Sequence, residues 1–275
     1  MKKFEGILLI TDLDGTLLNS ERKISAENIQ AIEYFKENGG SFTFVTGRMP
    51  YSAVSIFEAV RPNIPFGCIN GGGIYDYRKN QYLWTLPLSH DVIELIEFAD
   101  KSIKDLGIQV NTFENIYFCK ENTQMEIFRR ATGIPNLTED YKEIKESFAK
   151  ILFGDTDPDV ITYLAKILNE HPKAYMYDFI SAEPSLYEIL PKGSGKGNLI
   201  PKLSEITGLS LDKTIAVGDY YNDISMLKIA KIGVAVANAC DEAKAAADHI
   251  TVSNDEHAIA QIISDIDTGK ISFSK

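Results

Sequence analysis

The chain of 275 residues is 44% hydrophobic and 24% charged, which is typical of a soluble globular protein, and it is long enough for two domains. Its formal net charge of −11 argues against a nucleic-acid or anionic-membrane surface, because either would require a basic patch. The three cysteines and four histidines are scattered and form no zinc pattern, and no apolar stretch reaches membrane-spanning length. We therefore expect a cytoplasmic protein with reduced thiols and without nucleic-acid or membrane partners.

The first predicted strand is an apolar run that begins at residue 7 and ends on two carboxylates, Asp12 and Asp14. A continuous apolar run is typical of a buried parallel strand, and ligands bind at the carboxyl ends of such strands. If the strand continues through both acids, their side chains point to the same side, where they could hold a divalent cation and share nucleophile and proton-transfer roles. A plain surface turn is the alternative interpretation. A calcium loop is excluded, because Leu17 and Lys23 stand where that loop needs Gly and Glu.

Strand and helix patterns alternate at both ends of the chain, which is typical of a parallel α/β sheet. The first part predicts a helix over 25–38, a strand over 41–45, a helix over 51–60 and a strand near 66–69. The last part predicts a helix over 198–207, a strand over 214–217, a helix over 222–230, a strand over 232–236, and helices over 241–247 and 256–266.

The middle of the chain has a different pattern. It predicts a helix over 91–106, a hairpin over 108–120, a helix over 121–131, a strand over 149–153, a helix over 158–169, and strands over 175–180 and 185–190. This pattern predicts an α+β layer that is inserted into the first domain. The predicted fold class is α/β, with a Rossmann-like parallel-sheet core domain over 1–82 and 191–275 and an inserted α+β domain over 83–190.

Two further clusters follow predicted strands or begin predicted helices. Thr46 and Gly47, after the second strand, offer a hydroxyl and backbone N–H groups that suit a phosphate, although a turn or helix cap fits equally well. Lys196 lies in a glycine-rich segment that lacks the P-loop spacing, because Leu190 and Gly197 occupy the diagnostic positions. The segment is either a flexible linker or a loop that directs the Lys196 side chain toward an anion.

The segment after the 214–217 strand contains two acids and an amide within five residues: Asp219, Asn222 and Asp223. These oxygen ligands suit magnesium. If all four acids meet at one sheet edge, they cannot persist unaided, because two unit charges ~4 Å apart repel by roughly 4 kcal/mol at an effective dielectric of about 20. The arrangement therefore predicts a divalent cation and a role for Lys196 in offsetting the repulsion.

These motifs together resemble the haloacid dehalogenase superfamily of phosphatases, in particular the Cof-type branch with a large inserted cap. The resemblance depends on four segments in order: 12–16, 46–48, Lys196 with its glycines, and 218–223; it extends to the strand and turn at 233–239. The resemblance covers both ends of the chain. The insert over 83–190 matches only in its size and in its mixture of helices and strands. The resemblance implies that this insert is the cap that closes over the site and reads the leaving group.

The resemblance also implies a role for each site residue. Asp12 would be the nucleophile that forms an aspartyl-phosphate, and Asp14 the acid–base group. Mg²⁺ would lie between Asp12, the Asp14 backbone carbonyl and Asp219, with Asp223 bound directly or through water. The phosphoryl oxygens would be held by the side chains of Thr46, Lys196 and Asn222 and by backbone N–H groups near Leu13 and Gly47.

The implied function is that of a Mg²⁺-dependent phosphoric monoester hydrolase acting on small phosphorylated metabolites, with sugar phosphates as the expected substrates. A phosphomutase of the phosphomannomutase type remains an alternative, because it would use the same motifs. A signalling phosphoacceptor is the other alternative, but Asp14 argues against it, since an acid–base group turns a stored phosphoryl group into a hydrolysed one. The pattern is compatible with a monomer or a dimer.

Overall fold

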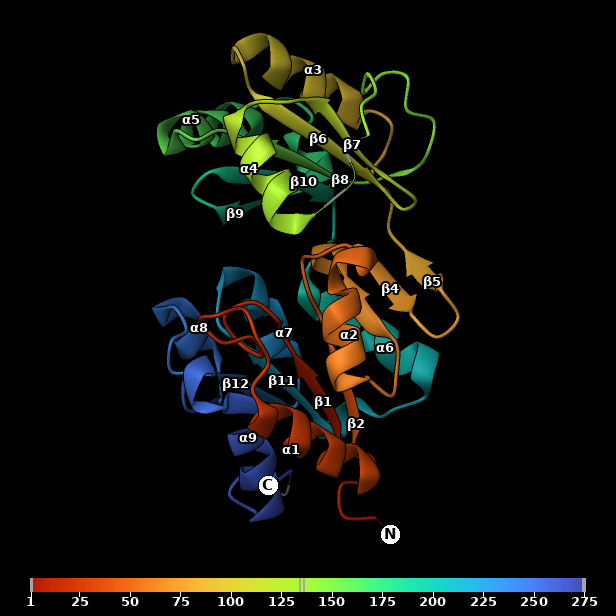
Figure 1. Cartoon of the computed structure of the whole chain (residues 1–275), viewed down its shortest axis with the longest axis vertical. Coiled ribbons are helices and arrows are strands. Elements are labelled where there is room, and N and C mark those ends of the chain that lie inside the picture. Colours follow the sequence, from red (N-terminus) through yellow and green to blue (C-terminus); the bar gives the residue numbers. More distant parts are fainter. Residues whose placement is uncertain (1, 134, 136, 274–275) are drawn as a thin grey trace. The chain divides into compact units, whose positions relative to one another are not determined.

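The computed structural model describes residues 2–133, 135 and 137–273, and the chain divides into two compact units (Figure 1). The core unit comprises Met1–Thr85 and Gly195–Lys275, and the inserted unit comprises Leu86–Ser194. These boundaries lie a few residues C-terminal to the ones expected from the sequence. The predicted fold class is confirmed: a parallel sheet forms the centre of one unit, and an antiparallel sheet with helices forms the other.

The core unit is built around a five-stranded parallel sheet in the order β13-β12-β11-β1-β2. Its strands are β1 (Leu8–Thr11), β2 (Ser41–Phe44), β11 (Thr214–Gly218), β12 (Ile232–Ala235) and β13 (His249–Ile250). Strand β1 lies between β11 and β2, and Thr11 pairs with Val217 on one side and Phe44 on the other. Because these three strands end level with one another, the residues that follow them meet at one edge of the sheet.

Helices cover both faces of this sheet (Figure 1). They are α1 (Ala26–Glu37), α2 (Val54–Val60), α6 (Leu199–Thr207), α7 (Ile224–Ile229), α8 (Asp241–Ala246) and α9 (Ala258–Asp267). Helix α1 begins where the sequence predicts, since the Ser25 side chain accepts a hydrogen bond from the Asn28 backbone N–H. Leu8 and Ile10 of β1 pack in one cluster with Leu203 of α6 and Met226 of α7, which anchors the central strand between the helices.

A separate three-stranded antiparallel sheet follows α2: β3 (Phe66–Cys68), β4 (Gly73–Asp76) and β5 (Gln81–Thr85). The sequence predicts the first of these strands but not the β4–β5 hairpin, because β4 follows a run of glycines that reads as loop. Between β3 and β4 the chain makes a short 3₁₀ turn, Ile69–Gly71. That turn lies beside the loop that contains Thr46 and Arg48.

The inserted unit has a five-stranded antiparallel sheet in the order β7-β6-β8-β10-β9. Its elements are α3 (Val92–Ser102), β6 (Gly107–Thr112), β7 (Ile116–Lys120), α4 (Thr123–Thr132), β8 (Phe148–Gly154), α5 (Pro158–Asn169), β9 (Tyr177–Glu183) and β10 (Leu186–Pro191). Apolar residues of α3 and α5 pack on one face of the sheet against alternate residues of β6, β8 and β10. The predicted helix over 91–106 is too long, because the backbone becomes extended at Ile103 to turn into β6.

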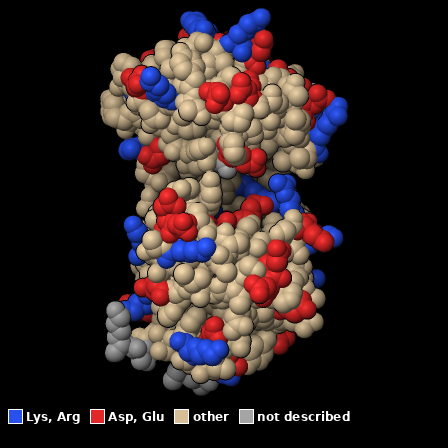
Figure 2. Space-filling model, turned by 90° about the vertical axis from the view of Figure 1, so that its left-hand side faces the viewer, with Lys and Arg blue, Asp and Glu red and all other residues tan. Residues whose placement is uncertain are grey.

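Acidic and basic side chains are interspersed on the visible face of each unit (Figure 2). Among the described residues, no helix combines the length and hydropathy needed to cross a membrane.

The packing of α6 on the central strand predicts a measurable stability difference within one helix. Replacing the fully buried Leu203 with alanine should lower the free energy of unfolding by about 2–5 kcal/mol, because it leaves a cavity against Leu8 and Ile10. The matched control, Ile206→Ala on the same helix, should change it by less than about 1 kcal/mol, because Ile206 is 36% exposed. Urea denaturation measures both, and equal losses would contradict this packing.

Candidate active site

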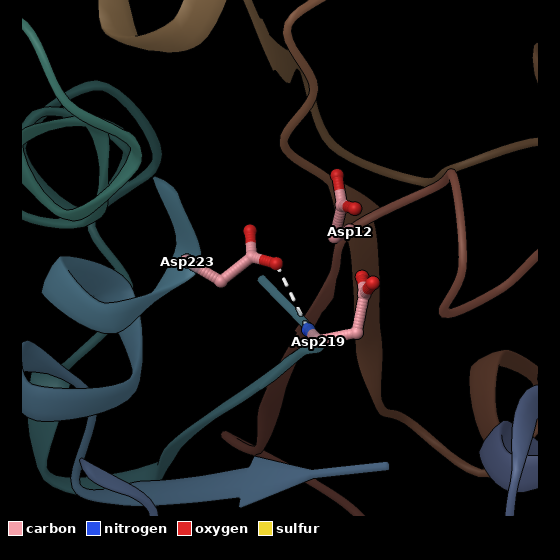
Figure 3. Close-up of side chains that lie close together, drawn as sticks. All are labelled: Asp12, Asp219 and Asp223. Carbon is pink, nitrogen blue, oxygen red and sulfur yellow. Dashed lines mark hydrogen bonds between the residues drawn. The ribbon is translucent and has the colours of Figure 1, made fainter. Parts of the chain in front are cut away.

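Three carboxylates meet at the carboxyl edge of the parallel sheet. Asp12 directly follows β1, Asp219 directly follows β11, and Asp223 ends the 3₁₀ turn Tyr221–Asp223 that leads into α7. One oxygen from each residue lies within 4.8 Å of the others, and the side chains face a common point (Figure 3). The register of β1 with β11 produces this convergence, as the sequence predicts for strand-end residues.

Lys196 is the cation at the centre of this cluster. Its Nζ atom donates to Asp12 Oδ1 at 2.7 Å and to Asp223 Oδ1 at 2.6 Å, and its side chain is 2% exposed. Burial by itself would lower the pKa of Lys196, but the two carboxylates outweigh that effect and the net pKa is raised. Lys196 is therefore charged at neutral pH and stabilises negative charge on Asp12.

Lys196 nevertheless supplies one positive charge against three carboxylates, so the cluster carries excess negative charge when all three are ionised. Burial raises the pKa of Asp12 well above its usual range, and the charges of Asp223 and Asp219 raise it further, against the opposing effect of Lys196. Burial, together with the charge of Asp223, raises the pKa of Asp219 to about 6. A divalent cation would favour the ionised forms, and carboxylate oxygens are the ligands that Mg²⁺ prefers. These residues therefore fit a magnesium ion.

Asp223 also holds the loop that carries Asp219. Its second oxygen, Oδ2, accepts hydrogen bonds from the backbone N–H of Asp219 at 2.9 Å and of Tyr220 at 3.0 Å. Both oxygens of this fully buried carboxylate thus have protein donors, and its contact with a metal, direct or through water, stays a prediction.

Asp219 is positioned by the turn after β1. The Thr16 hydroxyl donates to Asp219 Oδ1 at 2.7 Å, and a Cβ at Gly15 would come within 2.5 Å of Asp219 Oδ2. Gly15 also has a φ of +81°, so a side chain there would be both strained and obstructed. The sequence predicts a turn here, but not that the turn supports the neighbouring carboxylate.

The side chain of Asp14 does not join the carboxylate cluster. The Arg48 guanidinium donates from Nε to Asp14 Oδ2 at 2.9 Å and from Nη2 to Oδ1 at 2.5 Å, and the Asp14 side chain is half exposed. The expected convergence of four carboxylates is therefore wrong in this structure, and three converge. The physical reason is that β1 ends at Thr11, so strand alternation does not govern Asp14, and Arg48 supplies a counter-ion elsewhere.

The predicted phosphate-binding residues lie around the same sheet edge. Thr46 is buried and directly follows Val45, which forms an isolated β-bridge with Gly67. The Thr46 hydroxyl accepts a hydrogen bond from the Arg48 backbone N–H at 3.2 Å. Leu13 lies between the two acids that follow β1, with its side chain buried. Their roles as phosphate contacts remain predictions.

Gly47 and Asn222 meet through a residue to which the sequence analysis assigns no role, Asn70. Asn222 Nδ2 donates to Asn70 Oδ1 at 3.2 Å, and a Cβ at Gly47 would lie 2.8 Å from the Asn70 amide. Arg48 is the other residue without an assigned role, although it directly follows Gly47. The only sequence signal for Asn70 is its place at a strand end before a glycine run, which also marks ordinary turns.

The chain matches known proteins over nearly its whole length. Residues 9–263 match the family model of haloacid dehalogenase-like hydrolases. The chain is 30% identical to the 5-amino-6-(5-phospho-D-ribitylamino)uracil phosphatase YwtE of Bacillus subtilis, over 94% of this chain and 97% of that protein. It is 27% identical to the pyridoxal phosphate phosphatase YbhA of Escherichia coli, over 93% and 97%.

Solved structures give the same result. A haloacid dehalogenase-like hydrolase from Bacteroides thetaiotaomicron aligns with a TM-score of 0.84 and 26% identity, over 96% of this chain and 99% of that one. The chain therefore belongs to the haloacid dehalogenase-like hydrolase family, as its motifs predict. The expected enzyme class, a phosphoric monoester hydrolase, is confirmed by relatives that are named phosphatases.

The unbalanced charge predicts that the site destabilises the metal-free protein. Asp219→Asn should raise the midpoint of thermal unfolding in the presence of a chelator, because it removes a half-buried negative charge next to two others while an amide oxygen can still accept from Thr16. The matched control is Asp248→Asn, which changes an acid outside the cluster that accepts from the Gly233 backbone N–H, and this variant should not be more stable than the wild type. A midpoint lowered by Asp219→Asn would show that the cluster is not under repulsive strain.

Proposed function

We propose that this protein is a Mg²⁺-dependent phosphatase that hydrolyses small phosphate monoesters through an aspartyl-phosphate on Asp12. The observation that carries the proposal is the buried Asp12 carboxylate, hydrogen-bonded to the buried Lys196 ammonium within the Asp12–Asp219–Asp223 cluster. A carboxylate so placed lies at the strand end and is held in one orientation. Phosphoryl transfer needs mainly such positioning and charge neutralisation.

In the first step the Asp12 carboxylate attacks phosphorus, a new P–O bond forms, and the alcohol oxygen leaves with a proton from Asp14. In the second step Asp14 takes a proton from the water that attacks phosphorus, inorganic phosphate leaves, and Asp12 is regenerated. Lys196 neutralises negative charge throughout. The Thr46 hydroxyl, the Asn222 amide and the backbone N–H groups of Leu13 and Gly47 hold the phosphoryl oxygens in this proposal.

The metal ion belongs to the same proposal. Asp12, Asp219 and the backbone carbonyl of Asp14 would hold Mg²⁺, with Asp223 bound directly or through water. When bound, the ion would offset the charge of the carboxylates and of the transferring phosphoryl group.

The substrate class is inferred from the relatives. YwtE and YbhA are named for two compounds that are both phosphate monoesters of primary alcohols on small polar molecules. We propose the same class for this chain, with sugar and sugar-alcohol phosphates as representatives. Cys68, Cys119 and Cys240 are thiols and not disulfides, which supports a reducing, cytoplasmic location, where such metabolites occur.

The inserted unit is proposed to determine substrate choice. Ile108 and Val110 of β6 face the apolar cluster with α3 and α5, so Gln109 and Asn111 point to the opposite face of the sheet. That face also carries the buried ion pair of Lys150 Nζ with Glu188 Oε1 at 2.5 Å. Buried amides and a paired charge suit hydrogen bonding to a neutral polar group such as a sugar hydroxyl.

The primary test is phosphate release from ribose 5-phosphate, ribitol 5-phosphate, glucose 6-phosphate and p-nitrophenyl phosphate, with Mg²⁺ and with chelator. Wild-type protein should turn over at least one ester only with Mg²⁺, and Asp12→Asn should reduce that turnover by about 1,000-fold or more, because the nucleophile is lost. Asp248→Asn should retain activity. A stable phosphoprotein without phosphate release would instead indicate a phosphomutase or a phosphoacceptor.

The pairing of Arg48 with Asp14 predicts a dependence on the leaving group. Arg48→Met should reduce kcat for ribitol 5-phosphate about tenfold more than kcat for p-nitrophenyl phosphate. The reason is that Arg48 holds the Asp14 carboxyl group in one orientation, and an alkoxide needs the Asp14 proton whereas nitrophenolate leaves without it. Arg48→Lys keeps the charge but loses the two-point contact, and should give an intermediate ratio. If both esters slow equally, Arg48 does not act through Asp14.

A further inference from the structure

The turn between β3 and β4 has an unusual backbone. Ile69, Asn70 and Gly71 have φ angles of 59°, 49° and 104°, so three consecutive residues are left-handed. Glycine adopts this region freely and asparagine tolerates it, but a β-branched isoleucine there is strained. Such strain persists only where the surroundings hold it in place, and it is concentrated at functional sites.

The surroundings that hold this turn are the loops of the candidate site. The backbone N–H of Ile69 donates to Arg48 O, and that of Asn70 donates to Thr46 O, both at 3.1 Å. On the other side, a Cβ at Gly71 would lie 2.3 Å from the backbone nitrogen of Gly195, the residue before Lys196. The turn therefore fits between the Thr46 loop and the Lys196 loop.

This backbone places the Asn70 side chain between two proposed phosphoryl-binding groups. The residue is 4% exposed, and its amide lies against the Cα of Gly47, where a Cβ would come within 2.8 Å. Its Oδ1 accepts from Asn222 Nδ2 at 3.2 Å. Gly47 follows β2 and Asn222 follows β11, so Asn70 connects loops from opposite sides of β1.

We propose that Asn70 is a positioning residue for the phosphoryl site. It fixes the plane of the Asn222 amide through one N–H, so that the second N–H keeps a constant direction. This inference rests on the proposed phosphatase function and extends it. Because the phosphoryl group is common to all substrates, loss of Asn70 should affect every ester equally, unlike loss of Arg48.

The test is Asn70→Gly, which removes the amide but allows the left-handed backbone. We expect kcat/KM to fall about tenfold for both ribitol 5-phosphate and p-nitrophenyl phosphate, the size of one lost hydrogen bond, and inhibition by orthovanadate to weaken by a similar factor. The matched control is Asn80→Gly, another left-handed asparagine whose Oδ1 accepts from Tyr75 OH at 2.7 Å in the β4–β5 turn. It should leave activity within about twofold of the wild type.

A double-mutant cycle with Asn222→Ala separates positioning from a general structural role. If Asn70 acts through Asn222, kcat/KM of the double variant should be no lower than that of Asn222→Ala alone. The midpoint of thermal unfolding of the double variant should equal that of Asn70→Gly. Wild-type activity in Asn70→Gly, or losses that multiply in the double variant, would overturn the inference while leaving the phosphatase function intact. A wild-type protein that hydrolyses none of the esters would overturn both.

Discussion

The contact on which this site depends is the buried Lys196 ammonium shared by Asp12 and Asp223. A buried charge is costly unless it is paired and hydrogen-bonded, so none of the three groups is stable there without the others. Lys196 joins the end of β1 to the start of α7, and Asp223 in turn holds the backbone that carries Asp219. One cation thereby orders three carboxylates, but its single positive charge cannot neutralise all three when they are ionised. A divalent metal would offset that deficit and would also compensate the charge of a phosphoryl group in transfer.

The parallel sheet makes this arrangement possible because β11, β1 and β2 end in register. Loops from three strands therefore supply the proposed nucleophile, the proposed acidic metal ligands and a hydroxyl without long connections. The cost is local strain, visible in the left-handed turn after β3 that fits between two of these loops. Asp14 differs from these residues, because its side chain is half exposed and pairs with Arg48 outside the carboxylate cluster.

The acids, Thr46 and Lys196 are predictable from the sequence because each follows an apolar strand or a glycine run, and parallel strands bring such positions together. It could not foresee that the Asp14 carboxylate leaves the cluster, since that depends on where β1 stops and on a counter-ion 34 residues away. The role of Asn70 was equally hidden, because a turn asparagine and a buried asparagine that contacts Asn222 look alike in one sequence. The β4–β5 hairpin was missed because glycines that begin a strand resemble glycines in a loop.

The most direct test of the account is to trap the phosphoryl group during turnover. Wild-type protein mixed with ³²P-labelled ester and Mg²⁺, quenched in acid within milliseconds and digested, should carry label on the peptide that contains Asp12. The label should be released by hydroxylamine, as expected for an acyl phosphate. Label on a different residue, or rapid phosphate release without any labelled protein, would contradict the assignment of Asp12 as the nucleophile.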